Sequence, residues 1–336
     1  MFWKNYFATV THANHFCRAT AAALLTCLYT GAPAQDARVY PQRPVRFLIP
    51  VPPGGGADML GRTLGQKLSD KWGHTVVIDN RGGASGTVAV DTTAKAAPDG
   101  HTIVMGLIAS ITVAVSLRKL PYDPVTDLAP VTMLAVAQNI LVVHPSLPAS
   151  SVKELIALLK AKPAQFSYAS AGNGTSPHLS AELFKLMTGV SMTHVPYKGA
   201  GPALIDLVGG QVGVYFGSLP ATMPSVRSGK LRVLAATGLK RSALAPELPT
   251  VAEAGVPGFE SMQWYGVLAP AKTPVEILEK IRADMVATLQ LPDVKERMLS
   301  QGFEIVGNSR AAFGCYIKSE IAKWAKVIKE ANIRAD

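Results

Sequence analysis

Residues 47–58 read Phe47-Leu48-Ile49-Pro50-Val51-Pro52-Pro53-Gly54-Gly55-Gly56-Ala57-Asp58, and their order predicts a strand, a tight turn and a helix. The apolar run from Val45 to Ile49 has the length and composition of a short buried strand. The prolines and glycines then end the strand pairing and turn the chain. After Asp58, apolar residues recur at helical spacing as far as Trp72.

A helix that begins directly after a glycine turn leaves its first backbone N–H groups without partners inside the helix. Those groups carry partial positive charge, so they bind anions without any cationic side chain. The alternative is a plain strand-to-helix turn, with Asp58 favourably placed in the first helical turn. The glycines match neither the dinucleotide-binding fingerprint nor a Walker A loop.

The same strand, loop and helix order recurs along the chain, which predicts parallel βαβ units. A strand over 75–79 leads into a glycine loop over 80–86 and a helix over 87–97, and 102–107 is a third strand. Beyond residue 150, further strands lead into polar loops over 170–176, 197–201 and 217–219. In open α/β sheets ligands bind at the carboxyl ends of strands, so these loops predict a binding edge.

Two extended runs, 131–144 and 260–269, divide the chain into two lobes. The first run is too long for one ordinary strand, and we interpret both runs as crossings between the lobes. The expected first lobe comprises 35–138 and 266–336, and the second lobe comprises 139–265. Helices over 275–289 and 311–331 are expected to finish the chain. Two α/β lobes joined by two crossings form a hinged clamshell.

The segment 1–34 has the features of a secretory signal peptide. It carries two basic residues and no acidic one, has a short apolar stretch over 19–29, and ends in Ala32-Pro33-Ala34 before Gln35. The apolar stretch is too short for a permanent membrane anchor. We therefore predict cleavage after Ala34 and export to the periplasm. The alternative is a lipoprotein that is acylated at Cys27.

The composition is that of a globular protein, with 48% hydrophobic and 17% charged residues in a chain of 336. Removing the signal lowers the net charge from +10 to +8, because Lys4 and Arg18 leave with it. The remaining basic residues are scattered, which argues against a nucleic-acid surface and favours a mild attraction for anionic ligands. Cys315 is then the last cysteine, so no intramolecular disulfide is expected. No metal-ligand spacing is present, and we predict neither a metal nor a cofactor.

Motifs along the whole mature chain match one known family. They include Tyr40-Pro41-Gln42-Arg43-Pro44, Pro50-Val51-Pro52-Pro53-Gly54-Gly55, Asp79-Asn80-Arg81, Ala97-Pro98-Asp99-Gly100 and His194-Val195-Pro196-Tyr197-Lys198-Gly199. On these residues the chain resembles the Bug family, the periplasmic solute-binding proteins of tripartite tricarboxylate transporter systems. It departs from the family pattern at Val51, where phenylalanine is familiar. It also departs at 82–86, where Ser85 adds a hydroxyl beside the expected carboxylate seat.

The resemblance implies a type II periplasmic-binding-protein fold that holds a small carboxylate between its lobes. The ligand would be a di- or tricarboxylate, an acidic amino acid or an aromatic acid, with one carboxylate on backbone N–H groups and waters of the first two loops. The implied partners are the membrane subunits of such a transporter or a sensor kinase, and the protein is expected to be a monomer. The expected ligand-binding residues are Pro53, Gly54, Gly55, Asp58, Ala84, Ser85, Gly86, Thr87, Ser170, Ala171, Gly172, Asn173, Thr175, His178, Tyr197, Lys198, Gly199, Asp206, Gly217 and Ser218.

Two other function classes remain open from the residues. A secreted α/β hydrolase acting on a small acid or ester could draw its nucleophile, base and acid from six residues: Ser170, Ser218, His178, His194, Asp58 and Asp206. The chain has no G-x-S-x-G elbow, and a histidine inside a helix is more often structural. An exported interaction module without a small ligand is the third hypothesis.

Two side chains and two substitutions carry narrower expectations. Asp206 either pairs with Lys198 and steadies its loop or receives a ligand amine. Arg81 is expected to be solvated or to cap a loop rather than to bind the ligand. Valine at Gly55 or Gly86 should block the approach of an anion while the protein still folds.

Overall fold

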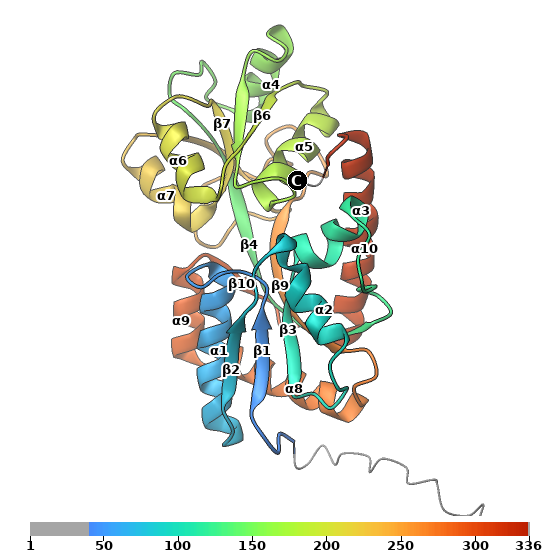
Figure 1. Ribbon diagram of the computed structural model, residues 1–336. Coiled ribbons are helices and arrows are strands. Elements are labelled where there is room, and N and C mark those ends of the chain that lie inside the picture. Colours follow the sequence, from blue (N-terminus) through green and yellow to red (C-terminus); the bar gives the residue numbers. More distant parts are fainter. Residues whose placement is uncertain (1–39, 335–336) are drawn as a thin grey trace, which may run out of the picture.

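The computed structural model describes residues 40–334 and consists of two α/β lobes, one above the other (Figure 1). The signal peptide, its cleavage point and Cys27 lie outside the described residues. Two long strands join the lobes: β4 (Leu128–Val143) and β9 (Met262–Pro270). The two-lobed α/β architecture expected from the sequence is confirmed.

One sheet of ten strands runs through both lobes in the order β2-β1-β3-β9-β4-β7-β5-β6, with β8 and β10 also paired to β4. The first-lobe strands besides β9 and β4 are β1 (Val45–Ile49), β2 (Val76–Asn80), β3 (Thr102–Leu107) and β10 (Phe303–Ile305). The second-lobe strands are β5 (Ser167–Ser170), β6 (Thr193–Pro196), β7 (Val214–Ser218) and β8 (Arg232–Ala236).

The strand directions make the carboxyl-end edges of the two lobes face each other. In the first lobe β1 runs parallel to β2 and β3, and β9 is antiparallel to both β3 and β4, so β4 runs in the direction of β1. In the second lobe β7 is antiparallel to β4, and β5 and β6 run with β7. The carboxyl ends of β1 and β2 therefore face those of β5, β6 and β7.

The strand β4 belongs to both lobes. It pairs with β9 as far as Gln138 and with β7 from Asn139 onward. Its partner on the other side changes over the same few residues, from β10 to β8. The change of pairing partner marks the passage of the chain from one lobe to the other.

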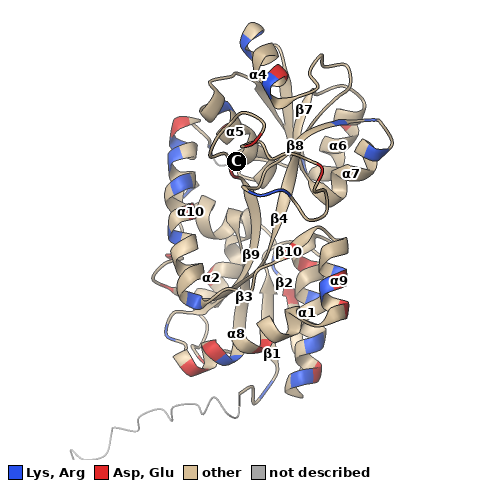
Figure 2. Ribbon diagram, turned by 180° about the vertical axis from the view of Figure 1, so that it is seen from behind, with Lys and Arg blue, Asp and Glu red and all other residues tan. Residues whose placement is uncertain are grey.

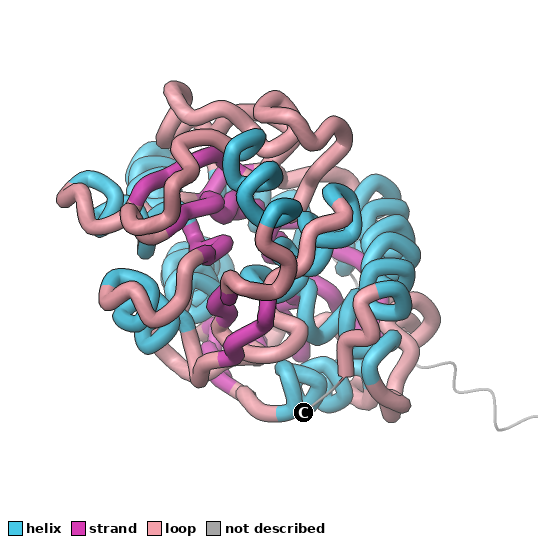
Figure 3. Tube along the Cα trace, turned by 90° about the horizontal axis from the view of Figure 1, so that it is seen from above, coloured by secondary structure: helices cyan, strands magenta, loops and turns pink. Residues whose placement is uncertain are grey.

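Helices flank the strands on both sides, as the view from above shows (Figure 3). The first-lobe helices are α1 (Gly56–Trp72), α2 (Thr87–Ala94), α3 (Ala114–Leu117), α8 (Val275–Leu289), α9 (Pro292–Ser300) and α10 (Arg310–Glu330). The second-lobe helices are α4 (Val152–Ala161), α5 (Ser176–Thr188), α6 (Ala200–Val208) and α7 (Leu219–Arg227). A 3-10 turn, η2 (Ala84–Gly86), precedes α2, and a π-helical segment, η3 (Ile108–Val113), precedes α3. Within residues 40–334, no helix is both long and apolar enough to cross a membrane.

The apolar cores hold the first two strands and the hinge. On α1, Leu60, Leu64 and Leu68 are fully buried at helical spacing against β1, each contributing about 1.5–3 kcal/mol relative to an exposed side chain. A second apolar cluster is continuous from Ile111 in the first lobe to Phe216 in the second. The lobes are therefore joined by packed side chains as well as by two strands.

Several segments differ from the sequence-based expectation. The chain ends in three helices rather than two, because α9 and the short strand β10 precede α10. The helix over 87–97 ends at Ala94. The segment of η3 and α3 was not expected to be helical, and it packs against α10.

Charged residues are distributed over the outside of the molecule. Figure 2 shows Lys and Arg mixed with Asp and Glu along outer helices such as α9 and α10. The crossings β4 and β9 contain no charged residue over their full lengths. No fixed charge of the strands themselves therefore lies at the hinge.

Candidate functional site

The two glycine-rich loops of the first lobe are fastened to each other. The first loop (50–55) follows β1 and the second loop (81–86) follows β2, its neighbour in the sheet. Asn80 Nδ2 donates to Val51 O at 3.1 Å and to Asp58 Oδ1 at 2.9 Å. The backbone N–H of Arg81 donates to Ile49 O at 2.8 Å. The two loops therefore form one surface at the carboxyl ends of the strands.

The Asp58 carboxylate shapes the first loop from beneath. It is 4% exposed and accepts hydrogen bonds from the backbone N–H of Gly54 at 2.9 Å and from Arg62 Nε at 3.0 Å. Burial alone would raise the pKa of Asp58, but the bonds from Arg62, Gly54 and Asn80 outweigh it and hold the pKa below its usual range. Asp58 is an ionised support of the loop.

The second loop contains a left-handed turn. Gly83, Ala84, Ser85 and Gly86 all have positive φ, at 105°, 46°, 60° and 87°, and the Gly86 N–H donates to Gly83 O at 2.8 Å. For Ala84 and Ser85 this conformation costs about 1–2 kcal/mol each. Backbone strain of this kind is concentrated at ligand sites, where the surrounding structure supports it.

The fold requires a glycine at position 86. The expectation that Gly86→Val folds normally and only blocks the anion is therefore wrong. A Cβ on Gly86 would lie 2.8 Å from Pro50 Cβ and 2.9 Å from Pro50 O, and φ is positive. A valine there would disturb the packing of both loops. Gly55, in contrast, has φ of −89°, and a Cβ there meets no atom within 4 Å. Gly55 is therefore the clean position for testing anion binding.

The helix starts at the facing edges lack side-chain caps. The N-cap residues of α1, α2 and α6 are glycines, and those of α5 and α7 are Thr175 and Ser218, none of which makes a side-chain cap bond. The Thr175 hydroxyl instead donates to Gly172 O at 2.6 Å. Away from this edge, Ser151 caps α4 and Ser309 caps α10 in the usual way. Five helix starts from two lobes thus present uncapped N–H groups toward one region.

Two histidines support the second-lobe loop over 170–176. His178 Nδ1 accepts from the backbone N–H of Gly174 at 3.0 Å, and its ring stacks on that of His194 at 4.0 Å. His194 Nε2 lies 2.6 Å from Ser170 Oγ. Burial lowers the pKa of His178 to about 3, so this ring is neutral at physiological pH. Ser170 is fully buried and cannot meet a substrate, which removes one of the two serines of the hydrolase hypothesis; the other, Ser218, is part-buried at the start of α7.

Asp206 pairs with Tyr197 rather than with Lys198. Tyr197 Oη donates to Asp206 Oδ2 at 2.7 Å, and burial together with this carboxylate raises the pKa of Tyr197 to about 12. The backbone N–H of Tyr197 donates to Ser170 O at 3.0 Å, so the loop after β6 is attached to the loop after β5. Lys198 is exposed.

The remaining expected residues fall into an exposed and a buried group. The exposed residues are all in the first lobe: Pro53, Gly54, Gly55, Ala84 and Ser85. In the second lobe the loop residues are part-buried: Ala171, Gly172, Asn173, Gly199 and Ser218. Thr87 is buried and donates to Ala84 O at 3.0 Å, which closes the second loop. A Cβ on Gly217 would meet Thr222 Oγ1 at 2.3 Å, so this glycine packs against α7 and presents no side chain to a ligand.

Two polar residues on the crossings were not among the predicted site residues. Asn139 and Gln263 lie between the two sets of loops, and Gln263 Nε2 donates to Asn139 Oδ1 at 3.2 Å. Their signal was visible as amides inside otherwise apolar strands, which are costly unless hydrogen-bonded.

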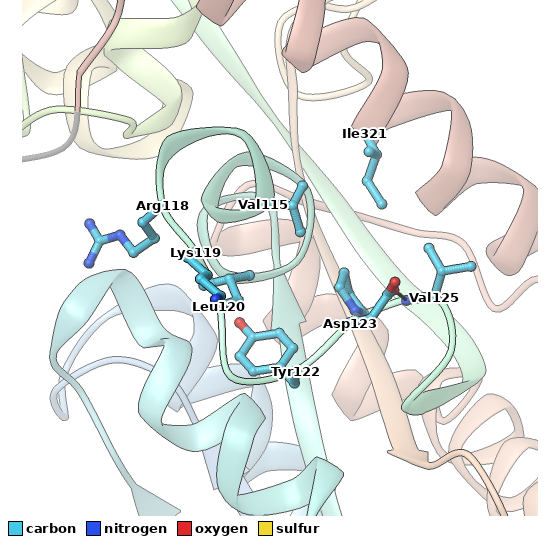
Figure 4. A pocket seen from close by; sticks show the side chains of 9 residues that line it. Val115, Arg118, Lys119, Leu120, Tyr122, Asp123, Val125 and Ile321 are labelled. Atoms are coloured by element: carbon cyan, nitrogen blue, oxygen red, sulfur yellow. Dashed lines mark hydrogen bonds between the residues drawn. The ribbon is translucent and has the colours of Figure 1, made fainter.

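A cavity of about 330 Å³ lies elsewhere, between η3–α3, the loop that follows and α10 (Figure 4). Its lining includes Val115, Tyr122, Val125 and Ile321, and none of the glycine-loop residues. Tyr122 Oη donates to Ser110 O at 2.7 Å, and Figure 4 shows the Arg118 guanidinium directed away from Val125 and Ile321. Among residues 40–334, no three His, Cys, Asp or Glu side chains gather as metal ligands would.

Comparisons with known proteins agree with this architecture. The family model described as "Tripartite tricarboxylate transporter family receptor" matches residues 60–333. The chain is 38% identical over 301 residues to Protein BugT of Bordetella pertussis, covering 89% of this chain and 92% of that protein. Among solved structures, "R. palustris Rpa4515 with adipate" is 40% identical with a TM-score of 0.77, covering 88% of this chain and 99% of that one. "MatC (Rpa3494) from Rhodopseudomonas palustris with bound malate" is 31% identical with a TM-score of 0.74, covering 86% and 100%.

These matches extend over most of the described chain and identify receptors rather than enzymes. They agree with the buried position of Ser170 in setting aside the hydrolase hypothesis. They also agree with the two lobes whose binding edges face each other. The chain belongs to the tripartite tricarboxylate transporter receptor family, whose Bug members are periplasmic solute-binding proteins.

Proposed function

We propose that this protein captures a small dicarboxylate between its lobes and passes it to a transporter of the tripartite tricarboxylate type or to a sensor. The observation that carries the proposal is the set of uncapped helix starts on both facing edges. Each edge favours an anion through backbone N–H groups and helix dipoles. A ligand with an acid group at each end matches both edges at once.

The relatives support the choice of C4 to C6 acids. One similar structure carries adipate and another carries malate, which are dicarboxylates of this size. In our proposal one carboxylate occupies the backbone of Gly54, Gly55, Ala84 and Ser85. The second acid meets the second lobe at the starts of α5, α6 and α7. Asp58 and His178 support these loops from beneath rather than contact the ligand.

Capture would proceed by closure of the lobes about the hinge. A ligand that touches both lobes binds the closed state better than the open state, which is the condition for shifting that equilibrium. We place the lobe boundary in β4 between Gln138 and Asn139, where its pairing partner changes. We further propose that the mature protein starts at Gln35, acts in the periplasm and is monomeric.

The test is a thermal-shift screen of C4 to C6 dicarboxylates, citrate, acidic amino acids and nicotinate, with neutral sugars as controls. A ligand at one hundred times its Kd stabilises the folded state by about 2.7 kcal/mol, which a melting curve resolves. A dicarboxylate should raise Tm, reduce the radius of gyration and be recovered unchanged after overnight incubation. A shift with sugars and none with any acid would reject the proposal, as would turnover of the ligand.

A further inference from the structure

A chain of hydrogen bonds crosses the hinge between the lobes. Tyr265 Oη donates to Gln263 Oε1 at 2.8 Å, and Gln263 Nε2 donates to Asn139 Oδ1 at 3.2 Å. Asn139 Nδ2 then donates to Ser176 Oγ at 2.7 Å and to Ser180 Oγ at 3.3 Å. Every donor in this relay points from the first lobe toward the second, an order in which successive bonds polarise and strengthen one another. We call Tyr265, Gln263, Asn139 and Ser176 the hinge relay.

The two ends of the hinge relay are at helix starts that face each other. A Cβ built on Gly56, the first residue of α1, would lie 3.5 Å from Tyr265 Oη. Ser176 is the first residue of α5 and directly follows the loop over 170–175. The hinge relay therefore connects the base of the first glycine loop with the base of a second-lobe loop.

Its central residue is placed where the two lobes meet. Asn139 is fully buried and is the first residue of β4 to pair with β7 instead of β9. Its backbone N–H donates to Thr237 Oγ1 at 3.0 Å, which lies in the second lobe. Its side chain bonds Gln263 of β9 on one side and α5 on the other. A buried amide with each group satisfied in this way fixes the relative position of its partners.

We propose that Asn139 is a positioning residue for ligand binding, which sets the helix starts of α1 and α5 at the separation that the closed, ligand-bound state requires. The proposal rests on the carboxylate binding argued above. It predicts that a change at one end of the hinge relay alters what the other end contributes to affinity. Replacing Asn139 itself would leave buried polar groups unpaired, so the informative variants are at the two ends.

The experiment is a double-mutant cycle of Tyr265→Phe and Ser176→Ala, read by calorimetric titration with adipate and with malate. Each single variant should weaken binding about threefold to tenfold. The double variant should bind little more weakly than the single variant with the lower affinity, because either substitution alone already interrupts the hinge relay. Tyr122→Phe combined with Ser176→Ala is the matched control. Tyr122 donates to Ser110 O within the first lobe and makes no bond to the hinge relay, so those two losses should multiply.

Melting curves of the ligand-free variants establish that each one folds. If the losses from Tyr265→Phe and Ser176→Ala multiply as in the control, the hinge relay does not couple the lobes and the proposal is overturned. Coupling of equal size in urea unfolding of the ligand-free protein would assign the relay to folding alone and would also overturn it. If the wild-type protein binds neither acid, the proposed function is rejected, and the role of Asn139 in ligand binding is rejected with it.

Discussion

The carboxylate of Asp58 lies 2.9 Å from the backbone nitrogen of Gly54, so the first glycine loop is closed by the helix that follows it. The same carboxylate also accepts from Asn80, which belongs to the end of the neighbouring strand. One side chain therefore sets the shape of the first loop and its attachment to the second.

Removing this carboxylate should destabilise the protein. Asp58→Ala is expected to lower the free energy of unfolding by about 2–3 kcal/mol, because charge-assisted bonds to Gly54 and Asn80 are lost together. Urea unfolding measures the effect. Asp70→Ala on the same helix is the control, since Asp70 is exposed and its hydrogen bond is to the surface side chain of Gln66 at 3.3 Å, so its loss should be below about 0.5 kcal/mol. Equal losses for the two variants would contradict the role of Asp58.

The buried His178 should make the protein sensitive to acid. Its folded-state pKa of about 3 lies below the unfolded value of about 6.5. The unfolded chain therefore takes up the proton first, and stability is complete above about pH 6.5 and falls as the pH drops toward 3, with a slope of up to about 1.4 kcal/mol per pH unit. Urea unfolding at several pH values should show a flatter slope for His178→Gln, which keeps an acceptor for Gly174.

Gly55 and Gly86 should respond differently to added side chains. Gly55→Val is expected to fold, with a loss of about 1 kcal/mol at most, and to weaken dicarboxylate binding more than tenfold because its Cβ occupies open space above the loop. Gly86→Ala should lower Tm markedly, since its Cβ meets Pro50 and its φ is positive. Melting curves and titrations of both variants decide the matter. Wild-type affinity in Gly55→Val would remove the first loop from the anion seat.

Arg81 should contribute little to affinity. Its side chain is 51% exposed and is bound to Asp79 at 3.0 Å, so it is not held ready for a ligand. Arg81→Ala should weaken binding less than threefold, because backbone N–H groups do most of the holding. If calorimetry shows that this variant abolishes binding while Gly55→Val does not, the assignment of the seat to the backbone is wrong.

The exported protein should begin at Gln35. Ala32-Pro33-Ala34 supplies the small residues that a signal peptidase requires. Intact-mass measurement of protein recovered from the periplasm gives the first residue directly. Retention of 1–34, or a mass increase from a diacylated Cys27, would contradict the prediction.

The parts of the fold that follow from local pattern were predictable. The strand β1, the glycine turn and α1 were visible because apolar runs, turn residues and helical spacing occur there in sequence. The helix α9 was missed because it buries only Val294 and Met298, so it carries almost no apolar stripe. The three-residue strand β10 exists through its pairing with β4 near Ala137, far away in the chain. Such elements depend on partners that a local pattern does not contain.

The candidate site shows the same division. Glycine loops at strand ends could be located from their composition, but the roles inside them could not. Asp58 and His178 became supports only when their backbone partners were known. The bond between Gln263 and Asn139 joins residues separated by 124 positions, which no short motif reveals. Tertiary contacts decide which polar residue faces a ligand and which one holds a loop.

The left-handed turn at Gly83–Gly86 has a consequence for how such receptors can diverge. In the function we propose, the anchor for the acid group is made of main-chain amides, which are present whatever side chains the loop carries, provided that the turn can form. A substitution of an exposed side chain in the turn therefore leaves these amides in place, whereas a substitution at Gly86 disturbs them. Ser85 is exposed and lies within the turn itself, so its hydroxyl can be exchanged for another side chain without removing the main-chain amides.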